Sequence, residues 1–227
     1  MKHFLNVKRK ISIIFSCLFS FLFCASLSSC SKRLDLMDYV SELRKNIFVA
    51  ETEDFSLRIY FVVKESPYLA DGIVQERSPR VEAHLITPEG RETCSISFFY
   101  SGKTYGGEMS FDNVKTEYYF SRTLDISNAN ELPCTIEYGN TKIEITAVSV
   151  KTSETFSPET ILKKLEREEK ELFTSLTDRY GFAGEIYLRL IYEDAPYYYV
   201  GIIDRNGKIN AFLLNANTGK ILAKRKT

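Results

Sequence analysis

The segment "FSLRIYFVV", residues 55–63, sets the fold class because its side chains alternate between two faces. Leu57, Ile59 and Phe61 fall on one face, whereas Arg58 and Tyr60 fall on the other. A period of two residues is typical of a β-strand with one buried face. Similar alternation recurs in "RVEAHLI" (80–86), "ETCSISFFY" (92–100), "VKTEYYF" (114–120), "CTIEY" (134–138) and "KIEITAVSV" (142–150).

Turn-forming residues separate these stretches. They are "TPEG" (87–90), "SGKTYGG" (101–107), "SNANELP" (127–133) and "YGN" (138–140). About seven short strands with hairpin turns favour an antiparallel, immunoglobulin-like β-sandwich, and a barrel fits the pattern almost as well. We therefore expect a mainly β protein with a β-sandwich domain over residues 55–150.

The pattern changes after a polar stretch at residues 151–157. Ser157 is typical of a helix N-cap and Pro158 of a first helical residue. An apolar stripe at helical spacing follows, and Gly181 predicts the helix end. Further alternating segments come next, with an Asn-Gly turn in "RNGK" (205–208). Residues 157–227 thus predict a small α+β domain, a helix followed by a meander of three or four strands.

The stretch "YYYVGIIDRNGKINAFLLNANTGKILA", residues 197–223, resembles the end of a PepSY-type domain, a module found in peptidase propeptides and in secreted bacterial proteins. In that family the penultimate strand commonly ends in an Asp-Ala-x-Thr-Gly turn. Asn215 stands here at the acidic position, with Ala216, Thr218 and Gly219 matching the rest. The resemblance implies a role in modulating a peptidase or a similar surface process.

Residues 35–48, "DLMDYVSELRKNIF", place apolar side chains at the spacing of a helix. The end of this segment could equally begin a strand. We expect a tether and a short helix over residues 30–54.

The first 29 residues have the composition of a targeting leader. Lys2, Lys8, Arg9 and Lys10 precede an uncharged segment that is long enough for a spanning helix or for the h-region of a secretory signal. The segment ends in "LSSC" (27–30), which resembles the lipobox of bacterial lipoproteins. That resemblance implies cleavage between Ser29 and Cys30 and lipidation of Cys30. All three interpretations place the remainder outside the cytoplasm, and the lipoprotein one predicts a membrane-surface location.

A diacylglyceryl cysteine carries two acyl chains, as stable membrane anchoring requires. Without the leader, 26 Lys and Arg stand against 30 Asp and Glu. This balance leaves no excess of positive charge to bind the phosphates of a nucleic acid, so we expect no nucleic-acid partner.

Catalytic motifs are missing from the sequence. His84 is the one histidine after the leader, which excludes a multi-histidine zinc site, and it is expected to point outward from its strand. No nucleophile elbow or phosphate-binding glycine loop accompanies it. We expect no catalytic residues, no metal and no cofactor. A hydrolase that uses two carboxylates stays open as a weaker alternative.

The sequence predicts two further features. The sixteen-residue connection at 64–79 is long enough to carry function, and Pro67, Tyr68, Asp71 and Gly72 are its candidate contact surface. Cys94 and Cys134 both face the sandwich interior, as a disulfide or as two buried thiols.

Exposed tyrosines, as in 197–199, would suit the binding of a peptide or a sugar. The favoured function is extracytoplasmic binding of a protein or peptide without catalysis, and the alternative is a carbohydrate- or envelope-binding lipoprotein.

Overall fold

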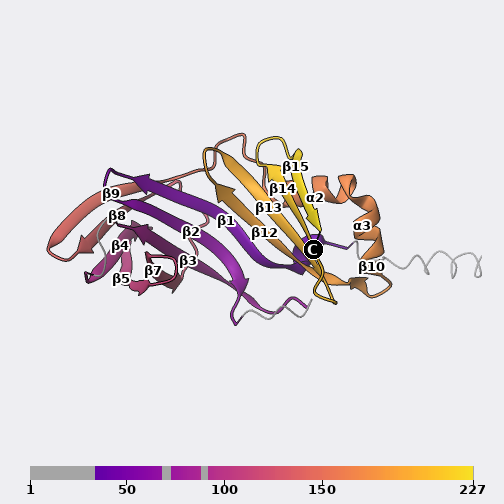
Figure 1. The fold of residues 1–227 in the computed structure, drawn as a ribbon, viewed down its shortest axis with the longest axis horizontal. Coiled ribbons are helices and arrows are strands. Elements are labelled where there is room, and N and C mark those ends of the chain that lie inside the picture. Colours follow the sequence, from indigo (N-terminus) through magenta and orange to yellow (C-terminus); the bar gives the residue numbers. More distant parts are fainter. Residues whose placement is uncertain (1–33, 68–72, 88–91, 227) are drawn as a thin grey trace, which may run out of the picture. The chain divides into compact units, whose positions relative to one another are not determined.

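Strands dominate the computed structural model, which describes residues 34–67, 73–87 and 92–226 (Figure 1). A short 3₁₀ helix, η1 (Leu36–Tyr39), precedes the first strand. The strands of the first part are β1 (Val40–Glu51), β2 (Ser56–Glu65), β3 (Arg77–Ile86), β4 (Cys94–Tyr100), β5 (Lys103–Glu108), β6 (Ser110–Asp112), β7 (Glu117–Thr123), β8 (Glu131–Tyr138) and β9 (Thr141–Ser149). The prediction of a mainly β protein is confirmed.

Strand β1 lies at the centre of the sheet. One edge pairs along its length with β2 in the antiparallel sense, from Glu42–Lys64 to Glu51–Ser56. The other edge is shared, because residues 40–44 pair in parallel with β12 (Gly184–Tyr192) while Phe48 and Val49 pair with β9. One strand therefore belongs to two branches of the same sheet.

The prediction of a helix in residues 35–48 is wrong beyond η1. Register shifts interrupt β1 between Val40 and Glu42 and again between Arg44 and Asn46. Each β-bulge inserts one extra residue into the strand, so the spacing between neighbouring side chains on the same face rises there from two residues to three. Val40 and Leu43 are consequently three residues apart, and Ile47, which pairs with the outward Tyr60, is buried on the opposite face of the strand. Together the three buried positions imitate helical spacing.

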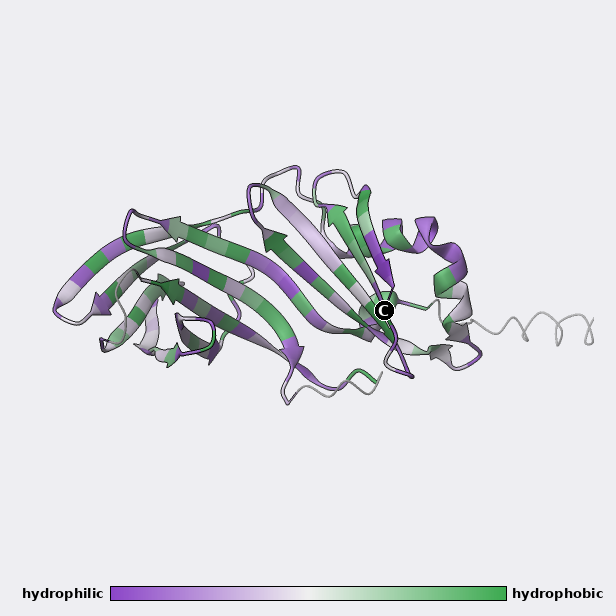
Figure 2. Ribbon diagram, viewed as in Figure 1, coloured by the Kyte–Doolittle hydropathy of each residue, from purple (hydrophilic) through white to green (hydrophobic). Residues whose placement is uncertain are grey.

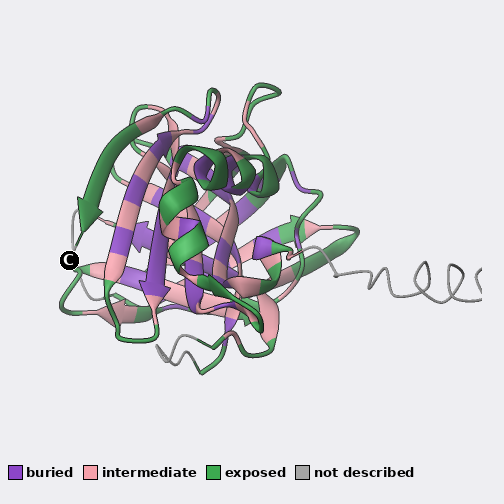
Figure 3. Ribbon diagram, turned by 90° about the vertical axis from the view of Figure 1, so that its right-hand side faces the viewer, coloured by how far each residue is buried: buried purple, intermediate pink, exposed green. Residues whose placement is uncertain are grey.

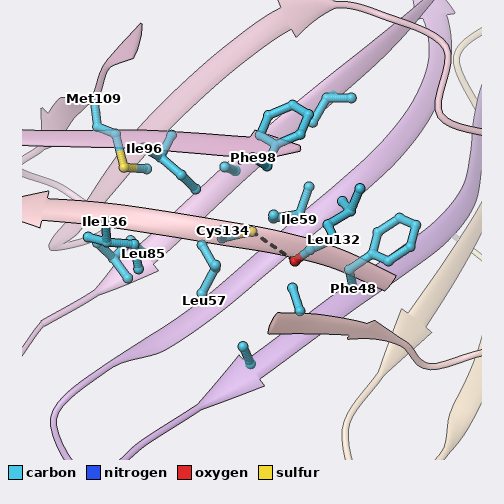
Figure 4. Packing of buried hydrophobic residues seen from close by; sticks show 14 of the residues in the cluster. Phe48, Leu57, Ile59, Leu85, Ile96, Phe98, Met109, Leu132, Cys134 and Ile136 are labelled. Carbon is cyan, nitrogen blue, oxygen red and sulfur yellow. Dashed lines mark hydrogen bonds between the residues drawn. The ribbon is translucent and has the colours of Figure 1, made fainter. Parts of the chain in front are cut away.

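The first part of the fold wraps a hydrophobic core between two sets of strands. One set runs β1-β2-β3-β7-β6, and the other runs β9-β8-β4-β5. The alternation of hydrophilic and hydrophobic residues is visible along these strands in Figure 2. Buried residues from both sets meet in the core, including Leu57, Ile59, Ile96 and Ile136 (Figure 4). The chain passes from β5 to β6 through the single buried residue Met109, so the outer strands of the two sets lie close together and the sheet nearly closes.

Strand β5 is missing from the sequence prediction. The segment "SGKTYGG" is predicted as a turn, but only Ser101 and Gly102 form the turn, both with positive φ. Residues 103–108 pair with β4 as β5. Gly106 makes this pairing close, since a Cβ there would lie 2.2 Å from the carbonyl oxygen of Ile96.

The last part consists of two helices and an antiparallel meander. Helices α2 (Pro158–Glu168) and α3 (Lys170–Ser175) lie over one face of the strands that follow, as Figure 3 shows. These strands are β12, β13 (Pro196–Asp204), β14 (Ile209–Asn215) and β15 (Ile221–Lys226), paired in chain order. A two-stranded ribbon, β10 (Thr177–Asp178) and β11 (Gly181–Phe182), joins α3 to β12.

The predicted helix start is confirmed and its predicted end is wrong. Ser157 is the N-cap, and its Oγ accepts a hydrogen bond of 3.2 Å from the amide of Thr160. The helix breaks at Glu169, and α3 ends at Ser175 rather than at Gly181. Gly181 instead lies in the ribbon with φ 130°, a backbone conformation that glycine tolerates best.

The turn at 215–219 is built around Asn215. Its Oδ1 accepts hydrogen bonds from the amides of Asn217 (3.0 Å) and Thr218 (2.9 Å) and from Oγ1 of Thr218 (3.1 Å). The neutral amide oxygen of Asn215 is therefore the acceptor that closes this turn. Gly219 has φ +70°, and a Cβ there would lie 2.4 Å from the Lys164 side chain of α2.

Residues 35–227 form one compact unit. Strand β1, from the segment expected to be a tether, links both expected domains through its pairs with β2, β9 and β12. The connection at 150–157 is partly held too, since the Phe156 amide donates to the carbonyl of Ala216 at 2.9 Å. The boundary at residues 151–157 therefore separates segments of chain that share one sheet.

The junction of β1 and β12 gives the first testable prediction. Ser41 and Glu185 are both fully buried, and Ser41 Oγ donates to Glu185 Oε1 at 3.2 Å. Ser41→Ala removes a donor from a buried carboxylate, which costs about 1–3 kcal/mol of unfolding free energy. Urea unfolding followed by circular dichroism measures the loss. The exposed Ser153→Ala is the control, and equal stability of the two variants would contradict a structural role for this bond.

Candidate functional site

A polar face covers the outward side of three neighbouring strands. Its residues come from β2, β3 and β7, and they are Tyr60, Lys64, Glu82, His84, Glu117 and Tyr119. The strands place them there because each alternates with a core residue, as His84 does with Ala83 and Leu85. The register sets Tyr60 opposite Glu82, and His84 opposite Tyr119.

His84 is held from three sides. Its Nδ1 lies 2.8 Å from Glu117 Oε1, and its side chain is only 15% exposed. The rings of Tyr60 and Tyr119 flank it edge-on, each with a centroid distance of 5.1 Å. The expectation of an outward histidine is right, but the ring is fixed in an aromatic slot rather than freely solvated. Glu117 also lies 3.5 Å from Nζ of Lys115.

A second ion pair lies beside this slot. Lys64 Nζ is 2.6 Å from Oε1 of Glu82, whose side chain is only 10% exposed. The hydroxyl of Tyr119 donates to the same oxygen at 3.3 Å. Charge-assisted hydrogen bonds of this kind fix the direction of each side chain. Lys64, Glu82 and Tyr119 therefore form a rigid unit.

Strand β1 extends the polar face toward β12. Arg189 Nε donates to Glu42 Oε1 at 2.8 Å, and a second bond joins Nη2 to Oε2, so the pair is bidentate. Arg44 places its guanidinium carbon 4.2 Å from the ring centroid of Tyr60, and its Nη1 donates to the carbonyl of Leu190 at 3.4 Å. Burial lowers the pKa of Arg44. These contacts connect the two branches of the sheet through side chains.

Two hollows adjoin on this face and share Lys64, Glu82 and Tyr119. One has a volume of about 390 Å³ and is lined as well by Glu42, Glu65, Ser66 and Arg80. The other has a volume of about 340 Å³ and is lined as well by His84, Ser110, Phe111, Asp112 and Lys115. Charged and aromatic groups thus surround both, and apolar side chains are few.

The turn between β6 and β7 shapes the second hollow. Oδ1 of Asp112 accepts hydrogen bonds from the amides of Lys115 (3.2 Å) and Val114 (2.8 Å). These backbone bonds lower the pKa of Asp112 below its ordinary value. Asp112 therefore stays ionised, and remains the acceptor of both backbone bonds, to a lower pH than an ordinary aspartate.

The predicted contact surface is only partly described. Pro67 is exposed just past the end of β2, and the Ser66–Pro67 peptide bond is cis. Tyr68, Asp71 and Gly72 lie outside the described residues, as do Ser29 and Cys30. The connection is shorter than expected, because β2 continues to Glu65 and β3 begins at Arg77. Glu65 and Ser66, at its base, line the first hollow.

Cys94 and Cys134 are buried free thiols, so the candidate disulfide is not formed. Both do face the core, as predicted. On the paired strands, however, Cys94 lies opposite Tyr138 and Cys134 lies opposite Phe98. This offset of four residues separates the two positions by roughly 13 Å along the strands, which is beyond the reach of a disulfide. Cys134 instead donates to the carbonyl of Leu132 at 3.1 Å (Figure 4).

The tyrosine pairs divide between the faces, as the alternation predicts. Tyr118 and Tyr198 are buried, whereas Tyr119, Tyr197 and Tyr199 are half-buried. Tyr187 lies across from Gly201 on the β12–β13 pair, and burial raises its pKa to about 12. The Arg189 guanidinium carbon lies 4.7 Å from the Tyr187 ring centroid, which partly offsets that rise.

Comparison with protein-family models, curated proteins and solved structures gave no match to this chain. Within residues 34–67, 73–87 and 92–226, no group of three or more His, Cys, Asp or Glu side chains is arranged to hold a metal ion. Among the described helices, none has the length and apolar character needed to span a membrane.

Sequence reasoning did not identify Lys64, Glu82, Glu117 and Tyr119 as a site. Each occupies an outward strand position, which is the ordinary place for a polar residue. The available signal was that charged and aromatic residues alternate with core residues in three strands. Only the strand order and register bring them together.

The thiols give the second prediction. Burial raises the pKa of Cys94 to about 11 and that of Cys134 to about 12. A thiol with a pKa near 11 is about one part in a thousand thiolate at pH 8, so alkylation of the folded chain is slow. Mass spectrometry should find both cysteines unlabelled by iodoacetamide before denaturation and both labelled after it, without a reductant. A pair that stays unlabelled after denaturation would instead show a disulfide.

Proposed function

We propose that this protein is a lipid-anchored, extracytoplasmic bacterial protein that binds a protein or peptide without catalysing a reaction. The observation that carries the proposal is the pair of adjoining hollows on the polar face. They share one rigid unit of Lys64, Glu82 and Tyr119, whose side chains are held in one orientation by their mutual contacts without a ligand. Preorganised groups lose little conformational entropy on binding.

The lining chemistry favours peptide over a small apolar ligand. Small-molecule pockets are mostly apolar with a few polar groups. These hollows have the reverse composition, with six of the seven residues of the first being Glu, Lys, Arg or Ser. Both signs of charge lie beside tyrosine rings, a combination suited to the varied side chains of a polypeptide.

A binding role also agrees with the state of His84. Its Nδ1 is engaged by Glu117, and two tyrosine rings restrict it from either side. An imidazole that acts as a general base needs a nucleophile or substrate proton within hydrogen-bond reach. The hydrogen bond to Glu117 and the two rings account for the position of His84 as a structural part of the face.

The finer fold assignment belongs to the same proposal. We propose that residues 55–150 with β1 form an immunoglobulin-like sandwich and that 157–227 form a PepSY-like module. Two core-facing sets of strands support the first assignment. Helix α2, the meander and the Asn215 turn support the second. A PepSY-like module would direct the binding toward a peptidase or an envelope process.

Photo-crosslinking tests this function. We place p-benzoyl-phenylalanine at Tyr119 in the full-length, membrane-anchored chain and expect irradiation to link it to a polypeptide of the cell envelope. Tyr180, which is 78% exposed and outside the polar face, is the matched control position. Adding Lys64→Ala should reduce the yield at position 119 about ten-fold, because Lys64 holds Glu82 and lines both hollows.

The control separates specific binding from chance encounter. Products that form equally at Tyr119 and Tyr180, or that persist in full with Lys64→Ala, contradict binding at the polar face. A product that is sensitive to glycosidase rather than protease would instead support carbohydrate binding.

The anchor gives a separate prediction. Cys30 follows Leu27, Ser28 and Ser29 in the lipobox-like sequence, and only its thiol can carry the thioether lipid. Cys30→Ser should abolish incorporation of labelled palmitate and leave the leader uncleaved or the product released. Cys24→Ser is the control and should label normally. A wild-type chain that never incorporates palmitate would refute the anchor.

A further inference from the structure

Glu65 is the one residue of the first hollow with an unusual environment. It is the last residue of β2, and its exposed fraction is 1%. Oε1 accepts a hydrogen bond of 2.6 Å from the amide of Gln75. Within the described chain Oε2 has no hydrogen-bond partner. A buried carboxylate oxygen without a partner is costly, so such a position points to a missing cation or donor.

The cations of the surrounding strands are committed to other partners. Lys64 pairs with Glu82, and Arg189 pairs with Glu42. Arg80 donates to Ser121 Oγ at 3.1 and 3.3 Å. Arg77 lies directly opposite Glu65 on β3, but its Nη1 donates to the carbonyl oxygens of Val40 (2.5 Å) and Met37 (3.3 Å). No ion pair to Glu65 occurs in the part of the chain that the structure describes.

We propose that the first hollow binds a primary ammonium group, with Glu65 Oε2 as its acceptor. This inference rests on the proposed peptide-binding function and names the side chain recognised, a lysine. Glu65 supplies one unoccupied oxygen, because Gln75 occupies the other. A guanidinium prefers two parallel bonds to one carboxylate, whereas an ammonium is a point charge that one oxygen satisfies. The hollow is lined by three carboxylates, Glu42, Glu65 and Glu82, against two cations, Lys64 and Arg80, so the net charge of its lining is negative and favours a cation of either kind.

The ligand class is organic rather than metallic. The described residues contain no cluster of acidic or histidine side chains arranged to hold a metal ion. The hollow, at about 390 Å³, has room for the end of an aliphatic side chain. The ring of Tyr119 supplies an apolar surface against which a methylene stem can lie.

Calorimetric titration of the full-length chain in detergent micelles tests the proposal with four probes. They are N-acetyl-lysine amide, N-acetyl-norleucine amide, which has the same four-carbon stem without the ammonium, N-acetyl-arginine amide and 1,5-diaminopentane. We expect the lysine probe to bind at least about ten-fold more tightly than the norleucine and arginine probes. Glu65→Gln, which keeps the shape of the side chain, should remove that difference. Glu76→Gln, in the exposed connection before β3, should leave it intact.

The outcomes separate this proposal from the general function. Lysine binding that depends on Glu65 supports it. Binding of the diamine alone, also dependent on Glu65, supports an ammonium site whose ligand is a free amine rather than a peptide. Equal binding of lysine and norleucine, equal binding of lysine and arginine, or no effect of Glu65→Gln overturns it. Crosslinking at Tyr119 that persists in Glu65→Gln would then leave the peptide-binding function standing.

Two controls accompany the titration. Near-ultraviolet circular dichroism checks that Glu65→Gln folds, and Glu65→Asp, which keeps the charge, should restore part of the lysine preference.

Discussion

The backbone pairing of β1 on both of its edges is the constraint on which the rest of the structure depends. A buried strand must place all of its N–H and C=O groups in hydrogen bonds. β1 does so with three partners, β2 along one edge and β12 and then β9 along the other. The parallel pair with β12 joins segments about 145 residues apart in sequence, such as Leu43 and Leu188. The bulges on either side of Leu43 allow the strand to change partner while Val40, Leu43 and Ile47 all stay buried.

This central strand also positions the candidate site. Glu42 and Arg44 of β1 stand between the polar face of β2, β3 and β7 and the Arg189 side of β12. Most side chains that line the hollows project from paired strands, so the sheet fixes their positions; Ser66 and Lys115 lie in the adjoining connections. The Lys64–Glu82 ion pair and the His84–Glu117 hydrogen bond then fix their directions. Recognition through such a face needs little rearrangement of the protein.

The sequence predicted the elements that follow a single period. Alternation located β2, β3, β4, β7, β8 and β9, and Ser157 with Pro158 located the start of α2. The sequence prediction missed β1 because bulges changed the two-residue period of its buried side chains. It missed β5 because Gly106 and Gly107 are typical of turns. The site needed information that local sequence does not contain. His84 meets Glu117 and Lys64 meets Glu82 only through strand register, and the offset of Cys94 from Cys134 likewise follows from register alone. Residue type could suggest inward cysteines, but not their separation.

Native-state hydrogen exchange tests most directly whether β1 makes residues 35–227 one cooperative unit. The amides of β12 and β13 should exchange with the same free energy, and the same dependence on denaturant, as the core amides of Ile96 in β4 and Ile136 in β8. The shared free energy would be that of global unfolding, because β12 could separate only by breaking the centre of the sheet. If β12 to β15 exchange together at a lower free energy while β4 and β8 stay protected, the last part of the chain unfolds independently and the central role of β1 is contradicted.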